Sequence, residues 1–76
     1  MEENKVSYVI EREIAVLSKN SNDYTKELNI VSWNNNKAKY DIRNWSPNKE
    51  KSLKGISLTE EETIALYQAL KNEFEK

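Results

Sequence analysis

The sequence predicts an α+β fold in which four antiparallel strands form a curved sheet and one C-terminal helix follows. Four segments rich in β-branched and aromatic residues are separated by polar clusters that favour turns. The last of these segments runs directly into a strong helix start signal. The chain has 76 residues, too few for a second hydrophobic core, so we expect a single domain over residues 1–76.

The first two strands are expected over residues 6–17 and 24–34. The first segment, VSYVIEREIAVL, carries apolar residues on both faces, which predicts a bulge or burial on two sides. In the second segment, Leu28 and Ile30 share one face of the strand. The opposite face carries Glu27, Asn29, Val31 and Trp33. Three Asn residues at 34–36 then predict a tight connection, because Asn accepts positive φ readily.

The third strand, expected over residues 37–45, has the clearest alternation. Ala38, Tyr40 and Ile42 lie on one face, which we assign to the core. The other face carries Lys39, Asp41, Arg43 and Trp45, so this pattern predicts an exposed tryptophan.

The fourth strand is expected over residues 49–58, after a turn at Ser46-Pro47-Asn48. Gly55, the one glycine of the chain, lies within it. A glycine inside a strand indicates a bulge or a close backbone approach, and we expect one of the two at this position.

The helix begins with Thr59-Glu60-Glu61-Glu62, in which Thr59 and Glu62 are spaced as a capping box. An apolar stripe continues to about residue 75 and contains Thr63, Ile64, Leu66, Tyr67, Leu70 and Phe74. The stripe is broad enough to pack on its own sheet, on a second copy, or on both. Because so small a core stabilises a chain weakly and no disulfide is available, we predict a homodimer with Tyr67, Leu70 and Phe74 at its interface.

The composition disfavours several classes of function. With no Cys and no His, the chain lacks the usual ligands of transition metals and the usual proton carrier of hydrolytic enzymes, so we predict no metal site, no cofactor, no small-molecule substrate and no enzymatic activity. No apolar run reaches the length of a membrane span, and the start MEENKV does not resemble a signal peptide. We expect no membrane contact and a cytoplasmic location, with association with the nucleoid as an option.

The charge is unevenly distributed. Residues 37–54 carry six basic and two acidic side chains, a balance of +4, whereas residues 59–76 carry five acidic and two basic ones, a balance of −3. Tryptophans beside cations are typical of proteins that stack single-stranded bases and contact phosphates. The predicted nucleic-acid-binding residues are Trp33, Lys39, Arg43, Trp45, Lys51 and Lys54.

Other interpretations of these residues remain open. Each tryptophan is also consistent with a core position, and each lysine with an ordinary solvated surface. A protein-interaction module would use the exposed tryptophans and the acidic helix as its contacts. An RNA binder would use the same stacking platform, since stacking does not sense the 2′-hydroxyl.

Two stretches, KYDIRNWSP and KGISLTEEE, resemble the single-stranded-DNA-binding domain of the positive cofactor four family of transcriptional coactivators. The resemblance covers roughly residues 8–72 and is greatest to a small bacterial, YdbC-like branch, into which ELNIVSWN also fits. It implies a homodimer formed through helices and sheet edges, with paired concave sheet surfaces that hold single-stranded DNA. It also implies nucleic-acid contacts at Trp33, Arg43, Trp45 and Lys54.

The chain departs from the eukaryotic members at Asn29 and Val31, where they carry basic residues, and at Asn44, where they carry an acidic one. Affinity is therefore expected to depend more on stacking than on charge along the second strand. Together, these observations predict a sequence-tolerant single-stranded-DNA-binding protein that acts in transcription regulation or DNA maintenance.

Overall fold

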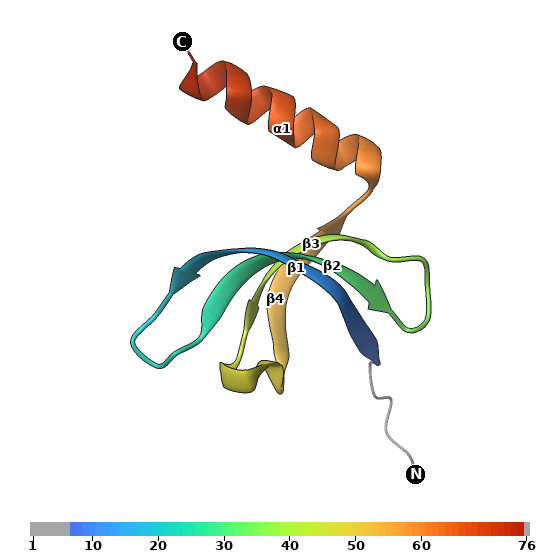
Figure 1. The fold of residues 1–76 in the computed structure, drawn as a ribbon, viewed down its shortest axis with the longest axis vertical. Helices are drawn as coiled ribbons and strands as arrows, with labels where there is room; N and C mark the ends of the chain where they lie inside the picture. The colour runs from blue at the N-terminus through green and yellow to red at the C-terminus, as the bar shows by residue number, and fades with distance from the viewer. Residues whose placement is uncertain (1–6, 76) are drawn as a thin grey trace.

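The computed structural model describes residues 7–75 and contains one four-stranded sheet followed by one helix (Figure 1). The strands are β1 (Tyr8–Lys19), β2 (Thr25–Trp33), β3 (Lys39–Trp45) and β4 (Ser52–Leu58). They pair antiparallel in the order β1-β2-β3-β4. A 3₁₀ turn, η1 (Pro47–Lys49), connects β3 to β4, and the helix is α1 (Glu60–Phe74). The predicted fold class is confirmed; residue 6, the expected start of the first strand, lies outside the described residues.

The β2–β3 connection is the tight turn that the three asparagines predict. Asn34 and Asn35 have φ of 52° and 64°, and the Asn36 N–H donates to the Trp33 carbonyl at 2.9 Å. Two consecutive positive φ angles define a type I′ turn, whose twist matches that of the strands it joins. The local sequence therefore reverses the chain after β2, and the β2–β3 ladder begins beyond the turn, at the pair of Val31 and Lys39.

The sheet is strongly curved, and its two ends bend away from α1 (Figure 1). The β1–β2 register shifts at three places, between Ile10 and Arg12, between Glu13 and Ala15, and between Val16 and Ser18. Bulges bend a strand and increase its twist, which accounts for the curvature of this pair. The bulge predicted for the first strand is confirmed.

Gly55 lies opposite Arg43 in the β3–β4 pair. A Cβ atom at Gly55 would overlap the Cβ of Arg43 and the carbonyl oxygen of Ile42. The β3–β4 register also shifts between Arg43 and Trp45. Both features expected of this glycine, the close approach and the bulge, are present.

The two faces of the sheet differ in burial, and the difference is the reverse of our prediction. We call the side away from α1 the concave face, which carries Tyr8, Glu27, Asn29, Val31, Trp33, Asp41, Arg43 and Trp45. The helix-side face carries Leu28, Ile30, Tyr40, Ile42 and Ile56. Val31 and Trp45 are fully buried on the concave face, together with three polar residues. The strand residues of the helix-side face are only half-buried or, at Ile56, exposed.

The expectation of an exposed Trp45 is therefore wrong. Its ring is 0% exposed. It lies on the concave side of the curved sheet, where the rings of Tyr8 and Trp33 pack against it. The helix-side face, which we assigned to the core, stays partly open because α1 leaves the sheet instead of lying across it (Figure 1).

The helix start is the predicted capping box. The Glu62 N–H donates to Thr59 Oγ1 at 3.0 Å, and the Thr59 N–H donates to Glu62 Oε1 at 2.9 Å. None of the helix residues is buried, and the large apolar side chains of the stripe are exposed. The stripe thus does not pack on its own sheet. Within residues 7–75, no helix is long and apolar enough to cross a membrane.

Candidate nucleic-acid interface

Three aromatic rings cluster on the concave face. The centroid of Tyr8 lies 5.4 Å from that of Trp33 and 5.2 Å from that of Trp45. The two indole rings are nearly parallel, with an interplanar angle of 8° and centroids 6.2 Å apart. The Tyr8 hydroxyl donates to the Lys49 carbonyl at 2.8 Å, which ties β1 to the β3–β4 turn. Trp45 is enclosed, whereas Trp33 is half-buried and keeps an accessible surface.

The Asp41 carboxylate accepts hydrogen bonds from the polar groups around Trp33. It is 1% exposed and accepts hydrogen bonds from Trp33 Nε1 at 3.1 Å and from Ser57 Oγ at 2.8 Å. Arg43 donates to the same carboxylate through Nε at 2.6 Å and Nη2 at 2.9 Å. Four donors therefore fix this carboxylate, and the carboxylate in turn fixes the orientation of the indole ring.

Arg43 covers the ring of Trp33. Its Cζ lies 4.4 Å from the ring centroid, and Nη1 donates to the Leu53 carbonyl at 3.0 Å. A guanidinium over an aromatic face is attracted by the ring quadrupole. Of the five N–H donors of an arginine, three are engaged here, which leaves two for a ligand.

A cavity of about 440 Å³ opens beside Trp33. It is lined by Trp33, Asn34, Asn36, Lys37, Lys39, Arg43, Ser52 and Ser57. The structure thus brings together Trp33, Lys39 and Arg43, three of the residues predicted from the sequence. An aromatic ring with ammonium and guanidinium groups around it is suited to stack a base and to contact phosphates.

The other predicted residues lie elsewhere. Lys54 lines a separate hollow with Lys26, Ile42, Arg43, Asn44, Gly55 and Ile56, most of them on the helix-side face. Lys51 is exposed in the β3–β4 turn, where its N–H donates to Ser46 Oγ at 2.7 Å. Trp45 is the fully buried ring of the aromatic cluster. Their roles in binding stay predictions.

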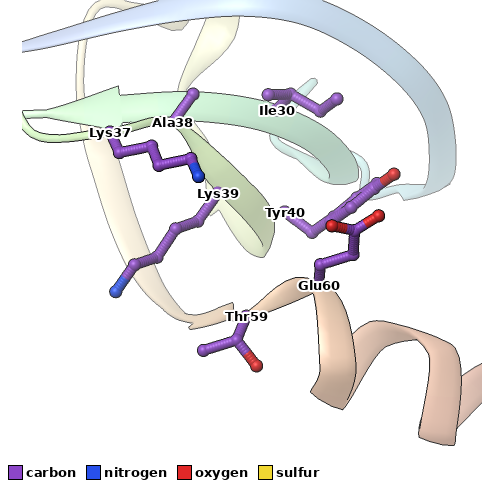
Figure 2. Close-up of a pocket in the computed structure, with 7 residues that line it drawn as sticks. All are labelled: Ile30, Lys37, Ala38, Lys39, Tyr40, Thr59 and Glu60. Atoms are coloured by element: carbon purple, nitrogen blue, oxygen red, sulfur yellow. The ribbon is translucent and has the colours of Figure 1, made fainter.

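A further cavity, of about 380 Å³, lies between the sheet and the start of α1 (Figure 2). Figure 2 shows Ile30 and Tyr40 of the sheet near Thr59 and Glu60 of the helix start. Lys39 lines this cavity as well as the one beside Trp33, so this residue borders both.

Sequence reasoning missed a buried ionic cluster around Glu27, which is 3% exposed. Lys49 Nζ lies 3.3 Å from Glu27 Oε2 and 3.5 Å from Glu13 Oε2. Thr25 Oγ1 and Asn29 Nδ2 donate to the Glu27 carboxylate at 2.7 and 3.0 Å. The one available signal was that Glu27 and Asn29 share a strand face with Val31 and Trp33.

These contacts shift the protonation equilibria of the pair. Burial alone would raise the pKa of Glu27, but the hydrogen bonds from Asn29, Thr25 and Lys49 outweigh it and lower the pKa from its ordinary value of 4.5. Burial alone would lower the pKa of Lys49, but its contacts with Glu27 and Glu13 outweigh it and raise the pKa from 10.5. Both groups are therefore charged at neutral pH, and Lys49 is less free to contact phosphate than its sequence position suggests.

Comparison with known proteins identifies the family to which this fold belongs. Residues 20–69 match the family model of Transcriptional Coactivator p15 (PC4). A protein of Treponema pallidum (strain Nichols), described only as an uncharacterized protein, is 44% identical over 63 residues, which is 83% of this chain and 74% of that protein. With its curved four-stranded sheet, its C-terminal helix and this match, the chain belongs to the Transcriptional Coactivator p15 (PC4) family, a non-enzymatic family that binds single-stranded DNA and acts in transcription.

Proposed function

We propose that this chain is a sequence-tolerant single-stranded-DNA-binding protein that acts in transcription regulation or DNA maintenance. The observation that carries the proposal is the oriented ring of Trp33, which Asp41 and Arg43 fix beside a cavity lined by Lys37 and Lys39. Every base has a π-face, so such a platform holds single strands with little regard to sequence.

In the proposed complex, a base stacks on the layer that the Trp33 ring and the Arg43 guanidinium over it form together, and the adjoining phosphates meet the ammonium groups of Lys37 and Lys39. Arg43 contributes its two unengaged N–H donors, while its pairing with Asp41 reduces its net attraction for phosphate. Trp45 supports the platform from the buried side. Lys51 and Lys54, which are exposed, contact the strand where it leaves the cavity.

We also propose that the protein acts as a homodimer. Tyr67, Leu70 and Phe74 are 58%, 46% and 81% exposed on α1, and the helix-side face of the sheet is incompletely covered. So much apolar surface is unusual on a small monomer and is typical of an interface. A second copy that packs on the stripe would remove this surface from water and stabilise a core that is small in one chain.

The binding proposal is tested by fluorescence anisotropy with labelled oligo-dT, the matching duplex and the RNA equivalent. We expect tight binding of the single strand, weak binding of the duplex, and quenching of tryptophan fluorescence on adding oligo-dT. Equal affinity for the duplex would contradict the stacking mechanism. Tighter binding of the RNA would instead identify an RNA-binding protein on the same platform, and no binding of any oligomer would favour a protein-interaction module.

The dimer proposal is tested by sedimentation of the parent chain and of Phe74→Glu. We expect the parent to sediment at twice its 8.9 kDa mass and the variant to dissociate, because a charge would be buried in the apolar contact. Asn72→Glu adds the same charge to the same helix outside the apolar stripe and serves as the control. A parent that stays monomeric at high concentration would overturn the proposal.

A further inference from the structure

Three polar residues form a row across the helix-side face of the sheet. Lys26 of β2 lies directly opposite Asn44 of β3. Lys54 of β4 precedes Gly55, which lies opposite Arg43 of the concave face, so alternation places Lys54 on the helix side. Lys26, Asn44 and Lys54 all line one hollow of about 550 Å³.

The row lies at the end of the sheet remote from the helix start. The helix α1 follows shortly after Leu58, which lies opposite Tyr40. Asn44 is four residues farther along β3, about 13 Å from Tyr40, and Lys54 is four residues before Leu58. The hollow is therefore separate from the cavity at the start of α1.

The two lysines of this row have no acidic partner. Within residues 7–75, neither Lys26 nor Lys54 forms an ion pair, and none of the residues that line the hollow carries a carboxylate. Both side chains are exposed, and the residue between them, Asn44, is neutral. Their backbones are about 10 Å apart, because a single strand separates β2 from β4. The hollow is therefore positive and attracts anionic groups.

The concave face, in contrast, has little positive charge to spare. The Asp41 carboxylate is paired with Arg43, and the carboxylates of Glu27 and Glu13 are both paired with Lys49. Three carboxylates with two cations attract phosphate weakly, although the aromatic rings beside them are suited to stack bases. The phosphates of a strand that extends beyond these rings are therefore drawn toward unpaired cations elsewhere.

The positive hollow and the cavity beside Trp33 lie on either side of β4. This strand is the last of the sheet, so within the described residues its outer edge carries no partner strand. Ser52 lines the cavity beside Trp33, and Lys54, two residues farther along β4, lines the hollow. Arg43 lines both. A nucleic-acid strand that leaves the cavity at Ser52 therefore reaches the hollow by turning over the β4 edge.

We propose that a bound single strand turns over the β4 edge and that its phosphates contact Lys26, Asn44 and Lys54 on the helix-side face. The inference rests on the proposed function and extends the binding surface beyond the concave face. The two ammonium groups pair with phosphate oxygens, and the Asn44 amide donates a hydrogen bond to them. Lys26 lies on the face opposite the aromatic cluster, so only a strand long enough to turn over the edge reaches it.

Oligomer length distinguishes the two parts of this path. The test uses a short labelled oligo-dT of about 4 nucleotides and a long one of about 16, the limits of the site sizes found for single-strand-binding OB folds. With the long oligomer, Lys26→Gln should flatten the slope of log affinity against log salt by about 0.7, the contribution of one phosphate. With the short oligomer, the slope should not change. Lys71→Gln, on α1, is the matched control and should change neither slope.

A second variant, Asn44→Asp, places a carboxylate between the two lysines at almost unchanged size. It should weaken binding of the long oligomer by about fivefold, the effect of one charge about 4 Å from another in water, and leave binding of the short one unchanged. Urea unfolding should show no loss of stability, because opposite charges on neighbouring strands are favourable. A merely structural role of Asn44 would instead lower stability and weaken the binding of both oligomers.

An unchanged slope for Lys26→Gln with the long oligomer would overturn the inference while leaving single-strand binding intact. Equal flattening with both oligomers would also overturn it, because Lys26 would then be reached without turning over the β4 edge. Failure of the parent to bind oligo-dT of either length would overturn the proposed function and this inference with it.

Discussion

The indole N–H of Trp33 donates a 3.1 Å hydrogen bond to the Asp41 carboxylate, and the same carboxylate holds the guanidinium that covers the indole ring. One buried acidic group therefore positions both the aromatic and the cationic part of the candidate site. Such pre-organisation lowers the entropy lost when a flexible single strand is bound.

Asp41→Asn should destabilise the fold. The amide keeps one acceptor oxygen but places an NH₂ group among four donors and leaves Arg43 without its counter-charge. Removing one partner of a buried ion pair costs about 3–5 kcal/mol, and the lower end applies because Arg43 keeps some exposure. Urea unfolding measures the loss. Asp23→Asn, in an exposed pair with Lys19, is the matched control and should cost less than about 1 kcal/mol; equal losses would refute a special role for Asp41.

Replacing each tryptophan with Ala should distinguish the structural role of one ring from the binding role of the other. Trp45→Ala should cost about 3–5 kcal/mol of unfolding free energy, because the ring is fully buried. Trp33→Ala should cost less stability but weaken oligo-dT binding by about 1–3 kcal/mol, the value of one stacked base. Urea unfolding and fluorescence anisotropy provide the two measurements. A Trp33→Ala protein that is folded and binds like the parent would exclude stacking on this ring.

Removing single positive charges should change the salt dependence of binding. Each phosphate neutralised on a single strand contributes about −0.7 to the slope of log affinity against log salt. Lys39→Gln and Lys54→Gln should each flatten the slope by about that amount, since both side chains are exposed. Lys71→Gln, on α1 and paired with Glu75, is the control. A slope that stays unchanged in Lys39→Gln would assign this lysine to the ordinary solvated surface.

Local signals in the sequence predicted the elements of the fold well. The Thr59 and Glu62 capping box depends on neighbours within one helical turn, and the Asn34-Asn35 turn on the φ preference of two residues. The spacing of Trp33, Lys39 and Arg43 along two paired strands also allowed their meeting to be predicted. Such features need no knowledge of distant contacts.

Which face of the sheet is covered was not predictable in this way. Alternation separates Tyr40 and Ile42 from Asp41 and Trp45 but does not say which set becomes buried. That choice depends on the curvature of the whole sheet and on the direction of α1 (Figure 1). The contact of Glu27 with Lys49 was missed because the two residues are far apart in sequence, so that no local pattern brings them together.

Gly55→Ala should destabilise the β3–β4 pair. The added methyl group would overlap the Arg43 Cβ and the Ile42 carbonyl, so the strands would have to separate locally. Overpacking of this kind costs about 1–3 kcal/mol, which thermal or urea unfolding would measure. Lys51→Ala, at an exposed site of the preceding turn, should change stability by no more than about 0.5 kcal/mol. If Gly55→Ala were as stable as Lys51→Ala, the backbones of β3 and β4 would not be in close contact at this position.

The Glu27 and Lys49 pair should make stability depend on pH at both extremes. The pKa of Glu27 is lowered from 4.5 on folding, so its contribution is present above pH 4.5 and is lost as the pH falls through the lower, folded value. The pKa of Lys49 is raised from 10.5, so its contribution is complete below pH 10.5 and is lost as the pH rises through the higher, folded value. The contribution of the pair to the free energy of unfolding is therefore constant across the neutral pH range.

Lys49→Met should move the acid limb of the stability profile to higher pH. Burial raises the pKa of Glu27, and the contacts with the Lys49 ammonium lower it. Because the substitution removes those contacts, the pKa of Glu27 rises. Urea unfolding at a series of acid pH values measures the shift, and Lys19→Met, in an exposed pair, should leave the profile in place. Glu27→Gln should abolish the contribution of residue 27 to the loss of stability at acid pH, because an amide does not titrate. If Glu27→Gln lost stability in acid as steeply as the parent, another carboxyl group would control the acid limb and the Glu27 and Lys49 pair would not.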